Sequence, residues 1–97
     1  MDSKLPAVYI LASARDGVLY AGVTSNLIKR VWQHQHGETG GFTAKYQVHR
    51  LVWYELHDTM ESAITREKQL KAGSRAKKIA LIAAMNPDWK DLYPGIL

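Results

Sequence analysis

The stretch AVYILASARDGVLYAGV, residues 7–23, decides the fold. Its two halves are rich in the β-branched and aromatic residues that favour strands, and Asp16 and Gly17 stand between them. An Asp-Gly pair between two such runs is a strong signal for a hairpin with a two-residue turn. The stretch therefore predicts two antiparallel strands, over residues 7–13 and 18–23.

This hairpin predicts that two tyrosines share one face of a sheet. With a two-residue turn, Ser13 lies opposite Tyr20 and Leu11 lies opposite Gly22. Directly opposed residues share a face, and so do alternate residues along one strand. Tyr9 and Tyr20 then lie on the same face, beside a glycine that has no side chain. They form either a shelf that a ligand can approach or two half-buried sheet residues.

The rest of the chain predicts helices packed against a third strand. Periodicity and breakers predict a helix over 26–36, a polar loop over 38–47, a strand over 49–56, helices over 59–72 and 75–85, and an irregular tail over 88–97. The tail carries Trp89, Leu92 and Tyr93, which are expected to dock on the body. The order ββαβαα predicts an α+β fold: a small three-stranded, mainly antiparallel sheet with flanking helices.

Capping residues support these three helices. Thr24 or Ser25 is placed to cap the first helix, and Ser74 the third. Asp58 and Glu61 have the spacing of a capping box for the second.

Length and composition exclude several classes of protein. The 97 residues are expected to form a single domain, 1–97, which is large enough to bury a core without cross-links. The absence of cysteine excludes disulfides, Cys-based zinc sites, iron–sulfur clusters and a thiol nucleophile. No apolar run reaches the roughly 20 residues of a membrane span, and residues 6–14 lack the basic flank of an export signal because Asp2 accompanies Lys4. We therefore expect a cytoplasmic protein without membrane contact.

Basic residues gather in one stretch of the chain. The formal net charge is +4, and residues 66–78 hold a single acid, Glu67, among six cations: Arg66, Lys68, Lys71, Arg75, Lys77 and Lys78. A nucleic acid is the commonest partner of such a cluster, and a solvated helix face is the alternative. All of the cations except Arg66 are expected to contact phosphates rather than bases.

The first helix carries two side chains that suit a phosphate. Its expected apolar stripe is Leu27, Ile28, Val31 and Trp32. Arg30 and His34 are one turn apart at the edge of that stripe. Arginine offers a two-pronged donor, and histidine is a donor or a proton carrier, although both are also common on solvated helices. The four histidines of the chain lack the spacing of a metal site such as HExxH.

The second helix places a carboxylate on its inward face. The expected apolar stripe of this helix is Met60, Ala63, Ile64 and Leu70. A projection at 100° per residue puts Glu67 in the middle of that stripe. An ionised carboxylate is rarely placed inward without a partner. The partner is either Arg30, in a structural ion pair, or a hard cation such as Mg²⁺.

Several of these residues also match a known family. Val8-Tyr9-Ile10 and Tyr20-Ala21-Gly22 resemble the paired motif of the GIY-YIG nuclease superfamily, which includes the N-terminal nuclease domain of a bacterial excision-repair excinuclease. Arg30 and His34 are similar to the arginine and histidine of the family's helix, and Glu67 to its metal-binding glutamate. The resemblance covers nearly the whole chain.

This resemblance implies an endonuclease that hydrolyses the phosphodiester bonds of nucleic acid, with DNA as the expected substrate. It also implies low intrinsic sequence specificity and a role in DNA repair or recombination. It implies one Mg²⁺ or Mn²⁺ ion, held by Glu67. Arg30 would neutralise the phosphate. Tyr9, Tyr20 or His34 would be the general base, and the sequence does not choose among them.

Some positions depart from the family pattern. Val8 and Ala21 replace isoleucines, Ala7 replaces the leading glycine, Val23 stands where some members have a lysine, and Gly73 where many have a tryptophan. The alternatives to a nuclease are a non-catalytic nucleic-acid-binding module and a subunit of a larger repair complex. A monomer or weak dimer is expected, and the sequence names no protein partner.

Overall fold

The computed structural model describes residues 5–97, so Asp2, Lys4 and the first four residues of the expected domain lie outside the described part. The elements are β1 (Ala7–Ala12), β2 (Leu19–Thr24), α1 (Leu27–Gln35), α2 (Gly41–Lys45), β3 (Arg50–Leu56), α3 (Met60–Ala72), α4 (Arg75–Met85) and α5 (Tyr93–Ile96). The predicted α+β class and the order ββαβαα of the main elements are confirmed. The short helices α2 and α5 lie where a loop and an irregular tail were expected.

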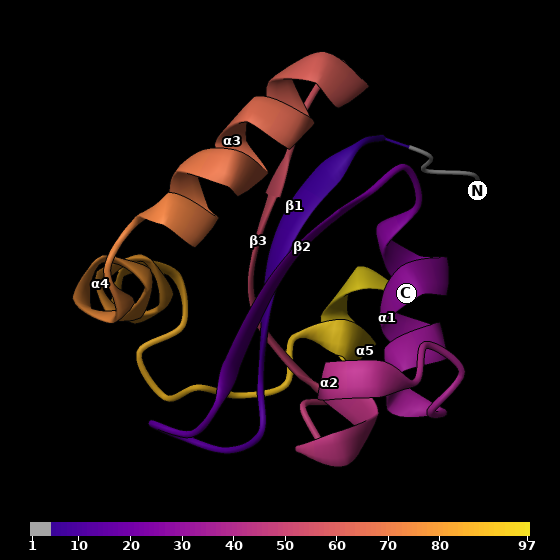
Figure 1. Cartoon of the computed structure of the whole chain (residues 1–97), viewed down its shortest axis with the longest axis vertical. Helices are drawn as coiled ribbons and strands as arrows, with labels where there is room; N and C mark the ends of the chain where they lie inside the picture. Colours follow the sequence, from indigo (N-terminus) through magenta and orange to yellow (C-terminus); the bar gives the residue numbers. More distant parts are fainter. Residues whose placement is uncertain (1–4) are drawn as a thin grey trace.

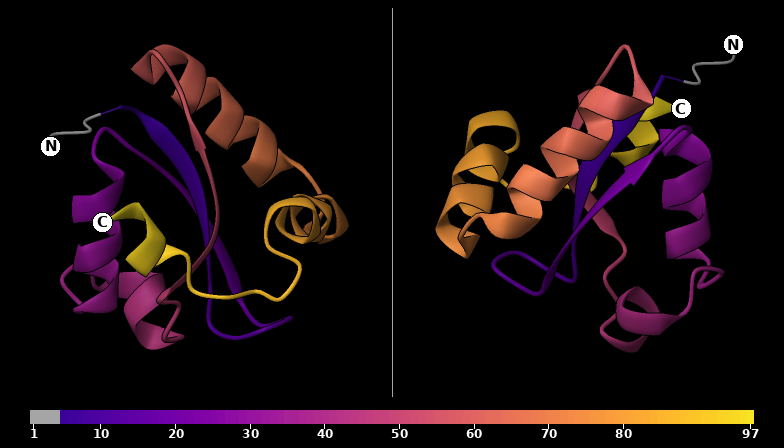
Figure 2. Two further views of the ribbon diagram at one scale, coloured as in Figure 1. Left: turned by 180° about the vertical axis from the view of Figure 1, so that it is seen from behind. Right: turned by 45° about the horizontal axis from the view of Figure 1, so that its top comes forward.

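The elements form three layers, with the sheet in the middle (Figures 1 and 2). Helices α3 and α4 cover one face, and α1, α2 and α5 lie on the other. The strand order is β2-β1-β3 and both pairings are antiparallel. Within residues 5–97 no helix has the length and apolar character needed to cross a bilayer.

Strand β1 is the centre of the molecule. Every residue in it is at most 1% exposed. Val8 and Ile10 pack into the core beneath α3 and α4, whereas Tyr9 and Leu11 pack into the core beneath α1. A strand that alternates between two buried faces needs apolar or aromatic residues at every position, which explains its unbroken apolar run.

The hairpin register differs by two residues from the prediction. Tyr20 pairs with Leu11 rather than Ser13, and Gly22 pairs with Tyr9 rather than Leu11. A shift of two residues leaves every side chain on its expected face because side chains alternate with a period of two. Tyr9, Leu11, Tyr20 and Gly22 therefore still share one face.

A wider loop than the expected two-residue turn causes this shift. The last hydrogen bond of the hairpin runs from the N–H of Ser13 to the carbonyl of Val18, at 3.0 Å. The carbonyls of Asp16 and Gly17 turn outward and accept hydrogen bonds from Arg75 Nη2, at 2.9 and 2.7 Å. The loop shape is therefore fixed by α4, which is distant in sequence.

The cap of α1 is Asn26, not Thr24 or Ser25. Asn26 Oδ1 accepts a hydrogen bond from the N–H of Lys29 at 3.2 Å. Thr24 instead accepts from the N–H of Asn26, at 3.0 Å, and so fixes the approach of the chain to the helix.

Of the two remaining cap predictions, the one for α4 is confirmed and the one for α3 is wrong. Thr59 caps α3, where its hydroxyl accepts from the N–H of Ser62, so Asp58 is not the cap. Ser74 caps α4 as predicted.

The buried stripes of α1 and α3 differ from the predicted ones. In α1 the buried residues are Leu27, Val31 and His34, and Trp32 is 41% exposed. In α3 the buried residues are Ala63 and Leu70, whereas Met60 and Ile64 are 36% and 37% exposed.

The C-terminal tail docks on the body as predicted. Trp89 is 3% exposed and joins the core beneath α4, and Leu92 and Tyr93 pack on the α1 side. The N–H of Leu92 donates to the carbonyl of Leu51 at 2.8 Å, so the tail also covers the start of the outer edge of β3.

Candidate active site

The candidate residues meet at the edge of the sheet formed by β2. Tyr9 from β1 and Tyr20 from β2 lie on the face covered by α1, and their ring centroids are 6.4 Å apart. His34 reaches the same place from α1, with its ring centroid 5.5 Å from that of Tyr20. Glu67 comes from α3 on the opposite face, and Lys71 links it to Tyr20 around the edge.

Gly22 gives the Tyr9 ring its place. A Cβ atom at position 22 would lie 2.5 Å from Cζ and from the hydroxyl oxygen of Tyr9. The Tyr9 ring of the central strand β1 therefore lies across the edge strand β2 at Gly22, which has no side chain. The expected shelf beside this glycine is filled by Tyr9 itself.

His34 is buried, whereas a place at the edge of the apolar stripe beside Arg30 was expected. Its side chain is 2% exposed, and its Nε2 lies 2.9 Å from the Tyr9 hydroxyl. Its Nδ1 lies 3.1 Å from Oγ1 of Thr43 and 3.0 Å from Oγ1 of Thr39. Both ring nitrogens are thus hydrogen-bonded, which is what a buried imidazole requires.

The two threonines are functional candidates that the sequence reasoning missed. Thr43 is 3% exposed and lies on α2, and the Thr39 and Thr43 hydroxyls are 2.9 Å apart. Their loop reads as polar and glycine-rich, and no local pattern in it indicates a contact with His34. A prediction that His34 is buried would have implied hydrogen-bond partners for its ring nitrogens, but the sequence did not give that prediction.

Burial sets the protonation states of the Tyr9–His34 pair. Burial, reinforced by the positive charge of Arg30 and by His49, lowers the pKa of His34 to about 4, so its ring is neutral at pH 7. Burial raises the pKa of Tyr9 to about 12, although a hydrogen bond from Arg30 opposes this. With the His34 proton on Nδ1, facing the threonines, Nε2 accepts the hydrogen bond of the Tyr9 phenol.

Arg30 is half-buried and supplies positive charge beside this pair. Its Nη1 donates a long hydrogen bond, 3.4 Å, to Gln33 of the same helix. A guanidinium held this loosely keeps most of its donors for an anionic group.

Glu67 is paired with Lys71 rather than with Arg30. Its side chain is 13% exposed, and Oε2 lies 2.8 Å from Nζ of Lys71, one turn along α3. This hydrogen bond is the main reason that the pKa of Lys71 is raised. The Lys71 ammonium also lies 5.8 Å from the centre of the Tyr20 ring.

The site offers one carboxylate to a metal ion. Residues 5–97 contain no group of three or more His, Asp or Glu side chains arranged to hold a metal. Mg²⁺ is commonly bound through one or two carboxylates, with waters and substrate phosphate completing its shell. Glu67 therefore fits a single Mg²⁺ or Mn²⁺ ion, for which Lys71 is a competitor.

The expected phosphate-binding cations divide into two groups. Lys71, Arg75 and Lys78 have partners within the protein, and Lys78 Nζ donates to the carbonyl of Gly73 at 2.9 Å. The ammonium groups of Lys68 and Lys77, which are exposed, have no such partner within residues 5–97.

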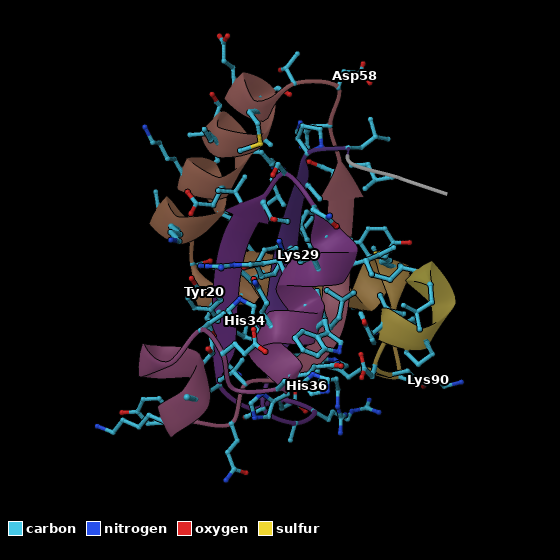
Figure 3. The ribbon with its side chains drawn as sticks, turned by 90° about the vertical axis from the view of Figure 1, so that its right-hand side faces the viewer. Tyr20, Lys29, His34, His36, Asp58 and Lys90 are labelled. Atoms are coloured by element: carbon cyan, nitrogen blue, oxygen red, sulfur yellow. The ribbon has the colours of Figure 1, made fainter. Side chains whose placement is uncertain are left out.

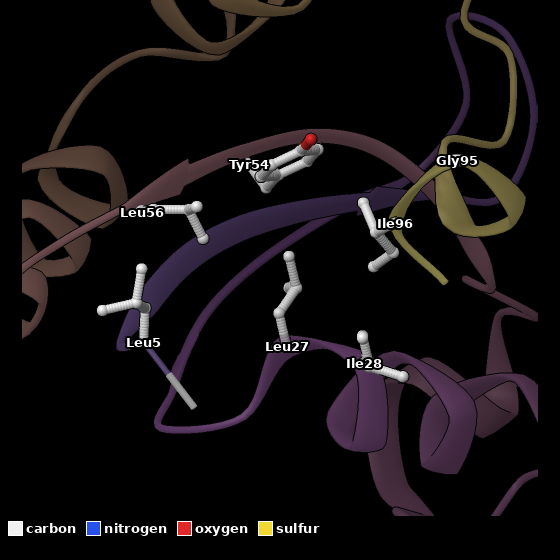
Figure 4. Close-up of a pocket in the computed structure, with 7 residues that line it drawn as sticks. All are labelled: Leu5, Leu27, Ile28, Tyr54, Leu56, Gly95 and Ile96. Carbon is white, nitrogen blue, oxygen red and sulfur yellow. The ribbon is translucent and has the colours of Figure 1, made fainter. Parts of the chain in front are cut away.

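A separate apolar pocket of about 190 Å³ lies at the other end of α1 (Figure 4). Leu27 and Ile28 line it from α1, together with Tyr54 and Leu56 of β3 and Ile96 of α5. None of the candidate site residues belongs to it.

Comparison with known proteins identifies the family of this site. Residues 5–80 match the GIY-YIG catalytic domain. The chain belongs to the GIY-YIG family. The predicted resemblance to these nucleases is thereby confirmed.

Relatives of this GIY-YIG protein are similar over most of their length. A UPF0213 protein of Staphylococcus saprophyticus is 36% identical over 76 residues, which are 78% of this chain and 92% of the relative. A UPF0213 protein of Natronomonas pharaonis is 41% identical over 76 residues, 78% of this chain and 88% of the relative. The solution NMR structure of a UPF0213 protein from Bacillus halodurans matches with a TM-score of 0.55 and 29% identity, covering 89% of this chain and 90% of that one.

Proposed function

We propose that the protein is a metal-dependent endonuclease that hydrolyses phosphodiester bonds of nucleic acid, with DNA as the expected substrate. Its intrinsic sequence specificity is low, and its role lies in DNA repair or recombination. The observation that carries the proposal is the buried hydrogen bond between Tyr9 and His34, with Arg30 beside it, in a chain of the GIY-YIG nuclease family. A phenol and an imidazole in contact provide a path for a proton next to a donor for an anion.

Phosphodiester hydrolysis makes three demands on such a site. A water must lose a proton as its oxygen bonds to phosphorus, the charge on the phosphate must be neutralised, and the departing oxygen must be stabilised. Arg30 is the donor for the phosphate oxygens. Glu67 would hold the Mg²⁺ ion, which when bound supplies Lewis-acid stabilisation of the phosphate and of the departing oxygen.

We assign proton acceptance to Tyr9 with His34 behind it. The phenol oxygen takes the proton of the water while its own proton passes to Nε2 of His34. In the protein without substrate this transfer is unfavourable by on the order of 10 kcal/mol, from the pKa values of about 12 and about 4. We expect the relay to operate with the negative phosphate bound, because that charge stabilises the protonated His34 ring, while the phenol regains a proton from the water and ends neutral.

The tyrosine pair is divided by its surroundings. The Tyr9 hydroxyl faces a base, whereas Tyr20 is half-exposed and lies beside Lys71. Tyr20 is therefore suited to orienting the water or the phosphate.

Plasmid nicking in Mg²⁺ or Mn²⁺, with EDTA as the blank, tests this proposal. Glu67→Gln should abolish cleavage and keep the wild-type melting temperature, and Glu61→Gln, an exposed acid on the same helix, should cut normally. Full activity of Glu67→Gln would remove the metal assignment.

Two phenylalanine variants test the proton relay. Tyr9→Phe should lower kcat by about 10²–10⁴, the usual contribution of a general base, and Tyr20→Phe by less. Wild-type rates in both variants would exclude the tyrosines as the base and leave His34.

The Glu67–Lys71 ion pair favours one alternative, a non-catalytic nucleic-acid-binding module, because it engages the carboxylate that would hold the metal ion. Under this alternative the wild-type protein binds DNA and never nicks it in any divalent metal.

A further inference from the structure

Two large aromatic side chains stand exposed beside the candidate site. Phe42 on α2 and Tyr46 at its C-terminal cap are 46% and 45% exposed, and their ring centroids are 4.8 Å apart. The Phe42 ring is also 6.2 Å from the Tyr20 ring. Three rings thus follow one another from the active-site edge outward over α2, and Figure 3 shows Tyr20 and His34 on the side of the molecule where this helix lies.

The position of this aromatic pair is fixed relative to the site. Thr43, which lies between Phe42 and Tyr46 in the sequence, points inward and bonds to His34. The carbonyl of Thr43 also accepts from the N–H of Val48, at 2.9 Å. The helix therefore buries its hydroxyl residue and presents its rings to solvent, the reverse of what packing against the core alone would favour.

The charge around the rings is complementary to a polyanion. Residues 39–50 contain no Asp or Glu. Lys45 Nζ lies 5.4 Å from the centre of the Tyr46 ring, as Lys71 lies over Tyr20. Exposed aromatic faces with cations beside them are the combination that binds the bases and phosphates of a single strand.

Trp32 differs from this pair although it is equally exposed. Its ring is stacked on His36, with centroids 4.1 Å apart and planes at 22°, so one of its faces is already covered. Within residues 5–97 its ring packs on no member of the Tyr20–Phe42–Tyr46 series, which makes Trp32 a suitable control.

We propose that Phe42 and Tyr46 form a stacking site for unpaired nucleobases next to the bond that is cleaved. The inference rests on the proposed nuclease function and extends it. Every base has a π face, so stacking tolerates any sequence. Bases inside a duplex already stack on one another, so the site selects nucleic acid in which a base near the scissile phosphate is unpaired. Phosphates alone would be bound by the cations without this selection.

Binding measured in EDTA, where cleavage is blocked, tests the stacking site. The probes are a fluorescein-labelled single strand of thymidylate and a strand of equal length made of abasic residues, which carries the same phosphates without bases. Phe42→Ala/Tyr46→Ala should weaken binding to thymidylate by about 5- to 100-fold and leave the abasic affinity unchanged. Phe42→Tyr and Trp32→Ala should bind both strands as the wild type does.

The other outcomes separate this inference from the function beneath it. Unchanged affinities for both probes in the double variant would overturn the stacking site while leaving the nuclease intact. Equal weakening of both probes would also overturn it, because the rings would then be supporting α2. A wild-type protein that binds neither probe would overturn the proposed function together with the inference. Oligouridylate in place of thymidylate shows whether the sugar matters.

Discussion

Lowering the pH should destabilise the protein through a single buried imidazole, that of His34. The folded pKa of His34 is about 4, against about 6.5 for an exposed histidine. Between these values the unfolded chain binds more protons than the folded one. The stability of the fold therefore rises with pH through this window and is lost as the pH falls from about 6.5 to about 4.

The size of the effect follows from the two pKa values. Between pH 7 and pH 5, the unequal proton uptake at His34 costs about 2 kcal/mol of unfolding free energy, and by pH 4 it costs about 3 kcal/mol. Surface screening does not reduce these values much, since the side chain is 2% exposed. Against a typical stability of about 5–15 kcal/mol, this is a large fraction.

Urea unfolding of the wild type and of His34→Gln, at pH 7 and pH 5, measures this effect. Glutamine can accept from the Tyr9 hydroxyl and donate to Thr43, and it does not titrate. Carboxylates contribute equally to both proteins, so the wild type should lose about 2 kcal/mol more than the variant between the two pH values. The same loss in both proteins would refute the buried neutral imidazole and the proton relay built on it.

Three further substitutions have distinct expected results. Gly22→Ala places a methyl group against the Tyr9 ring and should cost about 1–3 kcal/mol in urea unfolding and abolish nicking; a stable, active variant would mean that the ring is free to move. Arg75→Ala removes the hydrogen bonds to the hairpin loop and should lower the unfolding free energy by about 1–2 kcal/mol, whereas a loss of DNA affinity alone would make it a phosphate contact. Lys71→Gln removes the competitor for Glu67, so half-maximal nicking should need less Mg²⁺; an unchanged requirement would show that the ion pair does not oppose metal binding.

Local signals predicted most of the fold. The strands, the order of the main elements and the Ser74 cap follow from patterns within a few residues of each feature. The hairpin register did not, because Arg75 fixes the carbonyls of Asp16 and Gly17 from a distant part of the chain. Helix α2 was missed for a related reason: a glycine-rich segment becomes helical where Thr43 bonds to His34.

The candidate site was predicted unevenly. The alternation of strand residues placed Tyr9 and Tyr20 on one face, and a register error of two could not change that. The burial of His34 was not predicted because histidine is polar and the buried face of the helix was assigned from its apolar residues alone. The partner of Glu67 could have been predicted, since Lys71 stands four residues further along the same helix, which is the spacing of an ion pair.

The central position of β1 has a consequence for how the chain folds during its synthesis. This strand is made before the other two, and its second partner, β3, is complete only at Leu56. Until then the hairpin with β2 leaves one long edge of an apolar strand unpaired, and such edges promote aggregation of nascent chains. Fragments that end before β3 should therefore aggregate rather than fold into a smaller version of the protein.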